Sequence, residues 1–363
     1  MSVQKIKLVD FRNIENTVLD VSSPEVVLTG ENGQGKTNLI EALYILCYGN
    51  SFRTQRLSDC IRHGKEGFEI SFVYRDVAGL ESNVSFSYDG DVKTIRIDGR
   101  PVKDRKELIY NLPCIVFSHE DMEFVRGEPE NRRRFFNQIM TMYDVTFFDY
   151  LRAYGHVLRQ RNTAIKDARI ELLDVYDMKL ADYGQHIIRS RAAVCEAFDA
   201  IFPDIYGLVS GEDRKISITY KPSWSLELTT DGIMEKLRSS RETDIHMGTT
   251  TSGPHRDRFL INDENGLFVN SASTGQVRLA SIVMRIAQAA FFRQKTGENP
   301  LLLVDDVLLE LDGVKRSRCL QAFGKYSQAF FTFLPDEKYF SDDDSRPFRK
   351  FIVSKGVFHE EKQ

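Results

Sequence analysis

The chain has 363 residues, of which 42% are hydrophobic and 28% are charged, and this composition is typical of a globular protein with a sizeable core. The formal net charge of -4 excludes a polycation, so any surface for nucleic acid has to be local. The five cysteines lie far apart without metal-ligand spacing, which indicates buried thiols in a reducing compartment. No apolar run reaches the roughly 18 residues of a membrane span, and the N-terminus has no signal-peptide core. We therefore expect a soluble, cytoplasmic protein.

Residues 3–125 carry short apolar runs separated by turn signals, which predicts a strand-rich half-domain. Asp89-Gly90 and Asp98-Gly99 each interrupt a stretch of alternating apolar and polar residues. An Asp-Gly pair in that setting is typical of a tight hairpin. We therefore expect an antiparallel meander in this region.

From about residue 131 to 201 the apolar residues recur every three or four positions, as they do on one face of a helix. Two such segments, which begin near Phe147 and Leu173, are joined by a polar turn. This pattern predicts an antiparallel helical pair that forms an arm. Two ordinary core helices fit the same spacing, because two or three heptads do not define a coiled coil.

The segment Gly30–Thr37 fits the phosphate-loop (Walker A) pattern G-x-x-x-x-G-K-[ST], between a predicted strand at 26–28 and a predicted helix that follows it. Glycines let successive N–H groups point at phosphates, and the helix N-terminus adds partial positive charge. Lys36 is expected to neutralise the β- and γ-phosphates as a catalytic group, and Thr37 to hold Mg²⁺. The predicted nucleotide contacts of this segment are Gly30, Glu31, Asn32, Gly33, Gln34, Gly35, Lys36, Thr37 and Asn38.

A second motif is the apolar run 301–304, which ends on Asp305 and Asp306 and has the composition of a strand buried on both faces. Asp305 is expected to orient Mg²⁺, and Asp306 to polarise the attacking water as general base. In isolation, paired acids after a strand indicate a helix N-cap or a solvated turn. The phosphate loop earlier in the chain favours the catalytic interpretation.

A third motif, Ser273-Thr274-Gly275-Gln276, precedes a predicted helix from about Gln276 to Arg293. A small polar residue and a glycine at a helix N-terminus leave N–H donors that can face a γ-phosphate. Taken alone, the motif indicates only a capped helix. Its position just upstream of the acidic strand favours the anion site.

Eight Arg or Lys residues stand against four Asp or Glu residues between Arg126 and Lys166. The run Arg132, Arg133 and Arg134 suits DNA phosphate contacts without base readout. The alternative is that these side chains solvate a helix start or pair with nearby glutamates. In the string SGPHRDRF, residues 252–259, His255 and Arg256 fit a role in support of the head or of the interface, and the composition does not say which.

These motifs, in this order and with a long helical insertion between them, resemble the ATPase heads of the ABC family that act on DNA. The resemblance is greater still to the RecF family of bacterial recombination mediators. It is carried by the blocks DFRNIENTVLD, GENGQGKTNLIEALYILCYGNSFRT, FSHEDMEFVRGEPENRRRFFNQ, TSGPHRDRF, STGQVR and LLLVDDVLLELD. It implies an α/β fold: an ABC-type P-loop ATPase head from residues 1–125 and 236–363, with a mainly helical, coiled-coil-like arm over 126–235.

The resemblance also assigns roles to residues. In such families the phosphate loop of one subunit and the signature motif of another close over ATP, so the implied active unit is an ATP-dependent homodimer. Ser273, Gly275 and Gln276 would then act in trans. Asp305 matches the Mg²⁺ carboxylate, and Asp306 stands where related heads have their catalytic acid.

Further roles are implied outside these motifs. Asp312, in the segment Glu-Leu-Asp that follows the acidic strand, looks like part of the loop at the dimer interface. Arg12 and Asn13 match residues beside the nucleotide, and Arg53 resembles an arginine that joins ATP to the DNA-binding surface.

The implied function is a weak, DNA-stimulated ATPase of repair, replication and the damage response. It binds duplex DNA and single-strand/double-strand junctions, helps RecO/RecR-like partners load recombinase at gaps, and releases DNA after hydrolysis. Two departures from the family are His119 in place of a usual Pro, and Phe333 where a polar switch residue is expected after Thr332. The second motivates an alternative, an ATP-binding scaffold with little hydrolysis. The ATPase subunit of a membrane transporter is a third hypothesis, but its head lacks the long insertion.

Overall fold

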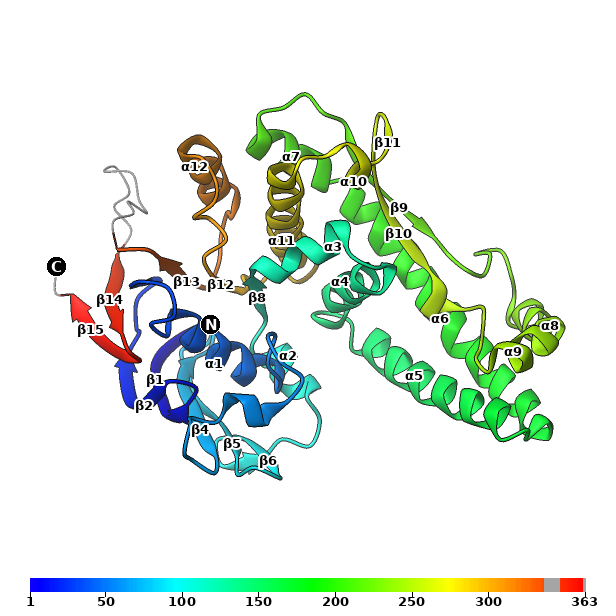
Figure 1. Ribbon diagram of the computed structural model, residues 1–363, viewed down its shortest axis with the longest axis horizontal. Helices are drawn as coiled ribbons and strands as arrows, with labels where there is room; N and C mark the ends of the chain where they lie inside the picture. Colours follow the sequence, from blue (N-terminus) through cyan, green and yellow to red (C-terminus); the bar gives the residue numbers. More distant parts are fainter. Residues whose placement is uncertain (336–346, 362–363) are drawn as a thin grey trace. The chain divides into compact units, whose positions relative to one another are not determined.

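The computed structural model describes residues 1–335 and 347–361. The chain forms two compact units: Met1–Glu120 with Gln288–Gln363, and Asp121–Ala287 (Figure 1). The first division lies near the expected boundary at 125/126, but the expected boundary at 235/236 differs. The second unit continues to Ala287 because β9 (Ile216–Lys221) pairs with β10 (Arg258–Asp263), which builds the later segment into the arm.

The first unit contains an antiparallel sheet in the order β2-β1-β4-β5-β6-β7. The predicted meander is confirmed, because Asp89-Gly90 lies between β5 and β6 and Asp98-Gly99 between β6 and β7. Asp98 and Gly99 have φ values of 49° and 75°, as a two-residue hairpin turn requires. The strands are β1 Ser2–Phe11, β2 Ile14–Asp20, β4 Phe68–Arg75, β5 Glu81–Tyr88, β6 Lys93–Ile97 and β7 Arg100–Pro101.

The second sheet of this unit has the order β15-β14-β3-β13-β12-β8, and all neighbours except β15 and β14 run parallel. Four of its strands, β3, β13, β12 and β8, are buried throughout, as the apolar run 301–304 predicted for β12. Their carboxyl ends meet at one edge, and the site is built there. The strands are β3 Glu25–Thr29, β8 Cys114–Phe117, β12 Leu301–Val304, β13 Gln328–Phe333, β14 Phe348–Ser354 and β15 Val357–Glu361.

Among its described residues, the first unit contains the α-helices α1 (Lys36–Tyr48), α2 (Lys106–Asn111) and α12 (Gly313–Ala322). Helix α1 is buried on almost every side, from Lys36 and Leu39 through to Tyr48. A fourth helix, α11 (Thr274–Thr296), begins in the second unit and ends in the first. None of the helices in the described part of the chain combines the length and the apolarity that a membrane span requires.

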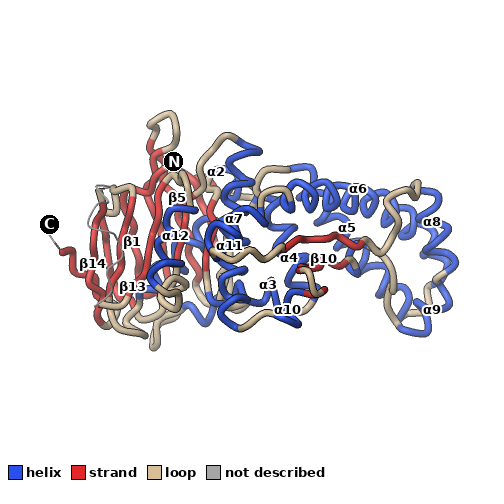
Figure 2. Tube along the Cα trace, turned by 90° about the horizontal axis from the view of Figure 1, so that it is seen from above, coloured by secondary structure: helices blue, strands red, loops and turns tan. Residues whose placement is uncertain are grey.

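The second unit is mainly helical, with one small sheet in the order β11-β10-β9 (Figure 2). The two expected long helices are α5 (Val145–Lys166) and α6 (Leu173–Asp199), which pack along one another as an antiparallel pair after a short 3₁₀ turn. The other elements are α3 Met122–Arg126, α4 Pro129–Thr141, α7 Phe202–Ser210, α8 Thr230–Ser239, α9 Arg241–Met247, α10 Phe268–Ser271 and β11 Gly266–Leu267.

Candidate nucleotide-binding site

The predicted phosphate loop connects β3 to α1, the context that the pattern requires. Its glycines are needed for conformation and space. Gly33 and Gly35 have φ values of 77° and 118°, which L side chains rarely adopt. A Cβ on Gly30 would lie 2.4 Å from the carbonyl oxygen of Val353, and one on Gly35 would lie 2.8 Å from Oδ1 of Asn13. Only glycine therefore allows this backbone path.

Lys36 is the buried cation of the loop, with a side chain only 3% exposed. Its Nζ donates to the carbonyl oxygens of Gly30, at 2.7 Å, and Glu31, at 3.3 Å, and lies 3.9 Å from Oδ2 of Asp306. Gly35 at the N-cap of α1 provides no side-chain cap, so the helix N-terminus keeps donors for an anion. This end of α1 therefore combines a fixed cation with helix N–H groups.

The two predicted acids meet the loop at the carboxyl ends of β12 and β13. Thr37 Oγ1 donates to Oδ1 of Asp305 at 2.9 Å. Thr332 Oγ1 lies 3.2 Å from Asp305 Oδ1 and 2.6 Å from Asp306 Oδ1, and accepts the backbone N–H of Asp306 at 2.7 Å. Asp306 has a positive φ of 54°, a conformation that Asp tolerates better than most residues. One hydroxyl from β13 thus holds both acids.

Thr332 is a site residue whose role the sequence analysis missed. The expectation was a polar residue after Thr332, but Phe333 is 1% exposed and belongs to the core. In the parallel register Val304 faces Phe331, so the next residue of β13 lies just past the end of β12, beside the acids. The polar group that Phe333 lacks is therefore supplied one position earlier.

The electrostatics of Asp305 favour a divalent cation. Burial, followed by the charge of Asp306, raises the pKa of Asp305 to about 6, against smaller opposing effects of the hydroxyls of Thr37 and Thr332. Two neighbouring carboxylates with a hydroxyl beside them are oxygen donors of the kind that Mg²⁺ prefers. The donor set of Thr37 and Asp305 therefore fits Mg²⁺, with the remaining positions open to water and phosphate oxygens.

The raised pKa of Asp305 gives a testable stability change. Between pH 3.8 and about 6 the folded protein binds more protons than the unfolded chain, so stability falls as pH rises through this window. Above it, the ionised group costs up to about 3 kcal/mol. We expect Asp305→Asn to raise the Tm of the nucleotide-free protein at about pH 7.5. It should also remove the Mg²⁺-dependent part of the stabilisation by ATP.

Calorimetry with and without Mg²⁺ and ATP checks this prediction. The control is Asp91→Asn, which removes an exposed acid from the same unit and should leave the Tm unchanged. A lower Tm for Asp305→Asn would mean that the hydrogen bonds from Thr37 and Thr332 outweigh the cost of burial.

Arg12 contacts helix α1, and Asn13 contacts the phosphate loop. Arg12 donates from Nε and Nη2 to the two carboxylate oxygens of Glu41, at 2.9 and 2.7 Å. Burial alone would raise the pKa of Glu41, but hydrogen bonds from Arg12 and Ser51 bring it below its ordinary value. Asn13 donates to the carbonyl oxygen of Gln34 at 3.1 Å. Arg12 therefore forms an ion pair with the buried carboxylate of Glu41, which the sequence analysis did not predict.

Arg53 lies at the cavity beside the predicted phosphate loop. It lines this cavity of about 260 Å³ together with residues 33–38 and Asp306. Its Nη1 donates to Oδ1 of Asn38 at 2.9 Å and to Oε2 of Glu41 at 3.0 Å. Asn38 in turn donates to Asn13 at 2.8 Å. The structure therefore places Arg53 beside the predicted nucleotide, while its contact with DNA stays a prediction.

The third motif forms the exposed first turn of α11, within the second unit. Ser273 Oγ accepts the N–H of Gln276 at 3.2 Å, and Gln276 Oε1 accepts the N–H of Ser273 at 2.9 Å, which makes a capping box. Gln276 Nε2 also donates to Glu212 at 3.0 Å. A Cβ on Gly275 would meet only Ser273 Oγ, at 3.9 Å. The motif therefore caps the helix, as the alternative interpretation predicted. Its turn is also exposed to solvent.

Two other predicted positions have local contacts. Asp312 is the N-cap of α12 and accepts the backbone N–H of Lys315 at 2.9 Å. His119, the residue that departs from the family pattern, is half-exposed, with Nδ1 3.6 Å from a carboxylate oxygen of Glu310.

The three predicted DNA contacts of α4 differ in burial. Arg132 Nη1 donates to the carbonyl oxygens of Val125, at 3.2 Å, and Gly127, at 2.9 Å. Arg133 Nη1 donates to that of Asp257 at 2.9 Å, and burial lowers the pKa of both arginines. Arg134 is exposed. The two half-buried arginines therefore hold backbone carbonyls, and only Arg134 keeps an exposed side chain.

Comparison with known proteins agrees with these features. Residues 2–345 match the family model described as RecF/RecN/SMC N terminal domain. The DNA replication and repair protein RecF of Treponema pallidum is 40% identical over 354 residues, which cover 97% of this chain and 99% of that protein. This chain belongs to the RecF family. The RecF of Ruminiclostridium cellulolyticum is 32% identical and covers 92% of each chain.

Solved structures extend the likeness to RecF in three dimensions. The recombination mediator protein RecF-ATP in the RecFOR pathway aligns with a TM-score of 0.89 at 26% identity, over 99% of this chain and 98% of that one. A RecF-ATPrS structure gives 0.87 at 27%, over 99% and 97%. An SMC head bound to the C-winged helix domain of ScpA, at 16% identity and a TM-score of 0.61, shares the fold alone. The expected ABC-type ATPase head with a helical arm is confirmed.

Proposed function

We propose that this RecF-family protein is an ATP-dependent DNA-binding ATPase of recombinational repair and replication in the cytoplasm. Two copies close on duplex DNA or on a single-strand/double-strand junction when ATP binds, and hydrolysis releases them. The observation that supports this most strongly is the cluster of Thr37, Asp305, Asp306 and Thr332 beside Lys36. The solved structures of RecF-ATP and RecF-ATPrS in the RecFOR pathway, to which this chain is similar, support RecO/RecR-like partners and loading of recombinase at gaps.

Each group has one task in this proposal. Lys36 turns from its carbonyl contacts to the β- and γ-phosphates, while Thr37 and Asp305 would hold Mg²⁺, which would supply neutralisation of the phosphate charge. Asp306 accepts the proton of the attacking water. Thr332 fixes the orientation of the Asp306 carboxylate through the 2.6 Å contact. Hydrolysis then removes the γ-phosphate of ATP, whose contacts hold the two subunits together.

The scaffold alternative, with little hydrolysis, rested on Phe333. Because Thr332 supplies a hydroxyl to both acids, the absence of a polar residue at 333 does not leave the acids unsupported. DNA-stimulated turnover of ATP separates the two functions, since a scaffold shows none.

The accessible turn at Ser273 supports a composite site in which this motif closes over ATP held by the other subunit. We expect Ser273→Arg to bind ATP with unchanged affinity but to weaken ATP-dependent dimerisation by more than about tenfold, because a bulky cation in a tightly packed interface costs at least about 1.4 kcal/mol. Sedimentation velocity with ATP and Mg²⁺ measures this. Ser239→Arg, at an exposed position of α8, is the control with the same change in charge. Dimers of normal stability from Ser273→Arg would refute the site in trans.

A further inference from the structure

The string SGPHRDRF, to which the nucleotide site assigns no role, carries a group of exposed cations. Arg256 lies in the 3₁₀ turn Pro254–Arg256, and Arg258 begins β10. Lys221 is the cross-strand partner of Arg258 in the register of β9 and β10. All three side chains are exposed, as is that of Arg134 on α4. Arg134 is grouped with them because α4 contacts β10, and we call Lys221, Arg256, Arg258 and Arg134 the arm cation cluster.

The turn that carries Arg256 and Arg258 is fixed from beneath by Asp257, which is fully buried. Asp257 accepts hydrogen bonds from Arg191 Nη1 and from the backbone N–H of Ser223, both at 2.8 Å, and from the hydroxyl of Tyr220. Arg191 Nη1 also donates to the carbonyl oxygen of Pro254 at 2.6 Å. With Asp257 held inward, its two neighbours in sequence point toward solvent.

A second set of contacts holds the same turn through His255. Its Nε2 lies 2.9 Å from the carbonyl oxygen of Thr250 and its Nδ1 lies 2.8 Å from the hydroxyl of Tyr154. Since a carbonyl only accepts, Nε2 carries the proton and Nδ1 accepts from Tyr154. Gly253 has a φ of 133°, and a Cβ there would lie 2.5 Å from the Tyr154 hydroxyl. The turn therefore has little freedom to move.

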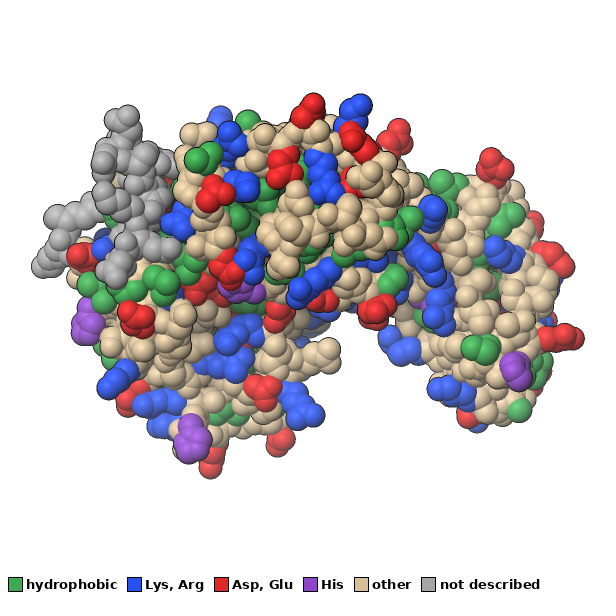
Figure 3. Space-filling model, turned by 45° about the horizontal axis from the view of Figure 1, so that its top comes forward, with side chains coloured by type: hydrophobic (Ala, Val, Ile, Leu, Met, Phe, Trp, Pro, Cys, Tyr) green, Lys and Arg blue, Asp and Glu red, His purple; other side chains and the backbone are tan. Residues whose placement is uncertain are grey.

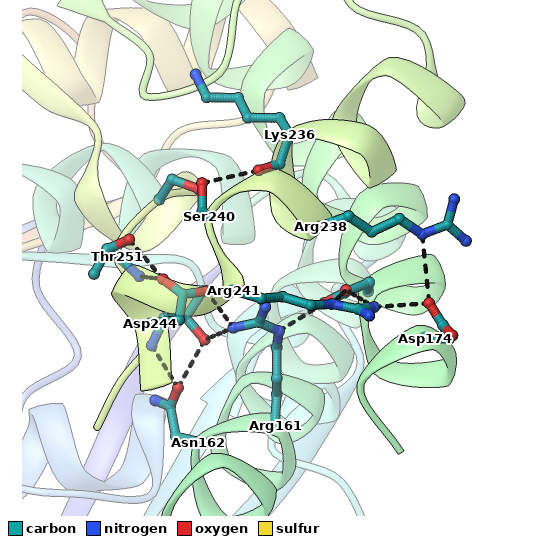
Figure 4. A network of polar contacts seen from close by, with 12 residues as sticks. Arg161, Asn162, Asp174, Lys236, Arg238, Ser240, Arg241, Asp244 and Thr251 are labelled. Atoms are coloured by element: carbon teal, nitrogen blue, oxygen red, sulfur yellow. Dashed lines mark hydrogen bonds and ion pairs between the residues drawn. The ribbon is translucent and has the colours of Figure 1, made fainter. Parts of the chain in front are cut away.

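Thr250 also contacts a buried network of ion pairs and hydrogen bonds, which holds the segment before the turn in place (Figure 4). Arg161, which is 0% exposed, donates to Asp177 and Asp244, both at 2.7 Å, and to Oγ1 of Thr250 at 2.8 Å. Arg241 donates to Asp177 at 3.0 Å. The network joins α5, α6 and α9 to the segment that leads into the turn.

Burying an ion pair costs desolvation free energy, and apolar residues of similar volume often stabilise a fold equally well. What the ion pairs provide here is a fixed position for a surface turn. A turn whose backbone is already fixed loses less conformational entropy when its cations bind an anion than a mobile turn does. The like charges of Arg258 and Lys221 face each other across two strands, which is unfavourable until an anion neutralises them.

Charge elsewhere on the surface is mixed. Among the described residues, the four side chains of the arm cation cluster have no ion-pair partner, whereas Arg191, Arg214 and Arg241 of the same unit each bind a carboxylate. On the face shown in Figure 3, Lys and Arg side chains are scattered among Asp and Glu. In a chain with a net charge of -4, a polyanion can therefore be held only where cations are locally in excess.

We propose that the arm cation cluster binds the phosphate backbone of duplex DNA. The inference rests on the proposed function, that the protein binds DNA, and gives that binding a location. The cations come from a turn, a sheet face and one helix position and not from an element that enters a groove, so they contact phosphates without reading bases. Binding at this surface is therefore independent of sequence.

The triple variant Lys221→Gln/Arg256→Gln/Arg258→Gln tests the proposal. Duplex affinity is measured by fluorescence anisotropy with ATP and Mg²⁺ at several salt concentrations. Since log K falls with log salt, each lost phosphate contact reduces the magnitude of the negative slope by about 0.9, so we expect the slope to become less steep by roughly 2 to 3. Two duplexes of unrelated sequence should lose affinity equally. The Tm, the ATPase rate without DNA and the ATP-dependent dimer should stay unchanged.

The matched control is Lys166→Gln/Lys179→Gln/Arg189→Gln, which removes three exposed cations from α5 and α6. It makes the same change in net charge and should keep the wild-type slope. A wild-type slope in the triple variant, with a folded protein, overturns the DNA surface while DNA binding by the protein stands. Equal loss in both variants overturns it too, because the effect is then one of net charge. Wild-type protein that binds no duplex at any salt contradicts the proposed function itself.

Discussion

Lys36→Ala is expected to abolish ATP binding, with an affinity loss of more than about 100-fold. Charge-assisted hydrogen bonds contribute about 1.5–3 kcal/mol each, and Lys36 is placed to make them to two phosphates. Its Nζ is already held at the loop by the carbonyl oxygens of Gly30 and Glu31, so little reorganisation is needed to reach a phosphate there. Calorimetric titration with ATP and Mg²⁺ measures the loss.

The control for this variant is Lys65→Ala, which removes an exposed lysine of the same unit that pairs with Asp10. It should bind ATP as the wild type does. Because Lys36 is buried, the Tm of Lys36→Ala must also be compared, so that an unfolded protein is not mistaken for an empty site. A folded variant that retains ATP affinity contradicts the phosphate-loop assignment.

Asp306→Asn is expected to bind ATP but to lose hydrolysis by on the order of 100- to 10,000-fold, the contribution of a general base. Asn tolerates the positive φ of 54° at this position and still contacts Thr332, so the backbone should be preserved. ATP is then held without being cleaved, and the dimer should persist on DNA. Single-turnover hydrolysis and the lifetime of the DNA complex measure the two effects.

A matched control for Asp306→Asn is Asp91→Asn, which makes the same change at an exposed acid of the turn between β5 and β6. It should hydrolyse ATP at close to the wild-type rate. If Asp306→Asn hydrolyses ATP as fast as the wild type, the general base lies elsewhere in the site.

The phosphate loop and both acids could be predicted because each is a local pattern at the end of a strand. Thr332 could not, because its role depends on which strand lies beside β12 and in which register. The ion pair of Arg12 with Glu41 was missed for a related reason. The local pattern of α1 does not show that the helix is buried on nearly all sides, so that its one acid, Glu41, requires a partner.

The count of charged residues did not predict the contacts that the arginines of the arm make. Arg132 and Arg133 stand in a basic run, but their partners are backbone carbonyls that no composition reveals. The boundary expected at 235/236 was misplaced because the pairing of β9 with β10 joins segments separated by two helices. The spacing of apolar residues therefore predicted the helices of the arm. The long-range pairing of β9 with β10 determined where the arm ends in the sequence.

Sedimentation velocity of the pure wild-type protein with Mg²⁺ tests the central claim most directly, in three samples: without nucleotide, with ATP, and with ATP and a short duplex. The account predicts a monomer without nucleotide, a dimer with ATP, and a dimer that sediments with the duplex. A monomer in all three samples would contradict closure of two copies around DNA and would favour the scaffold.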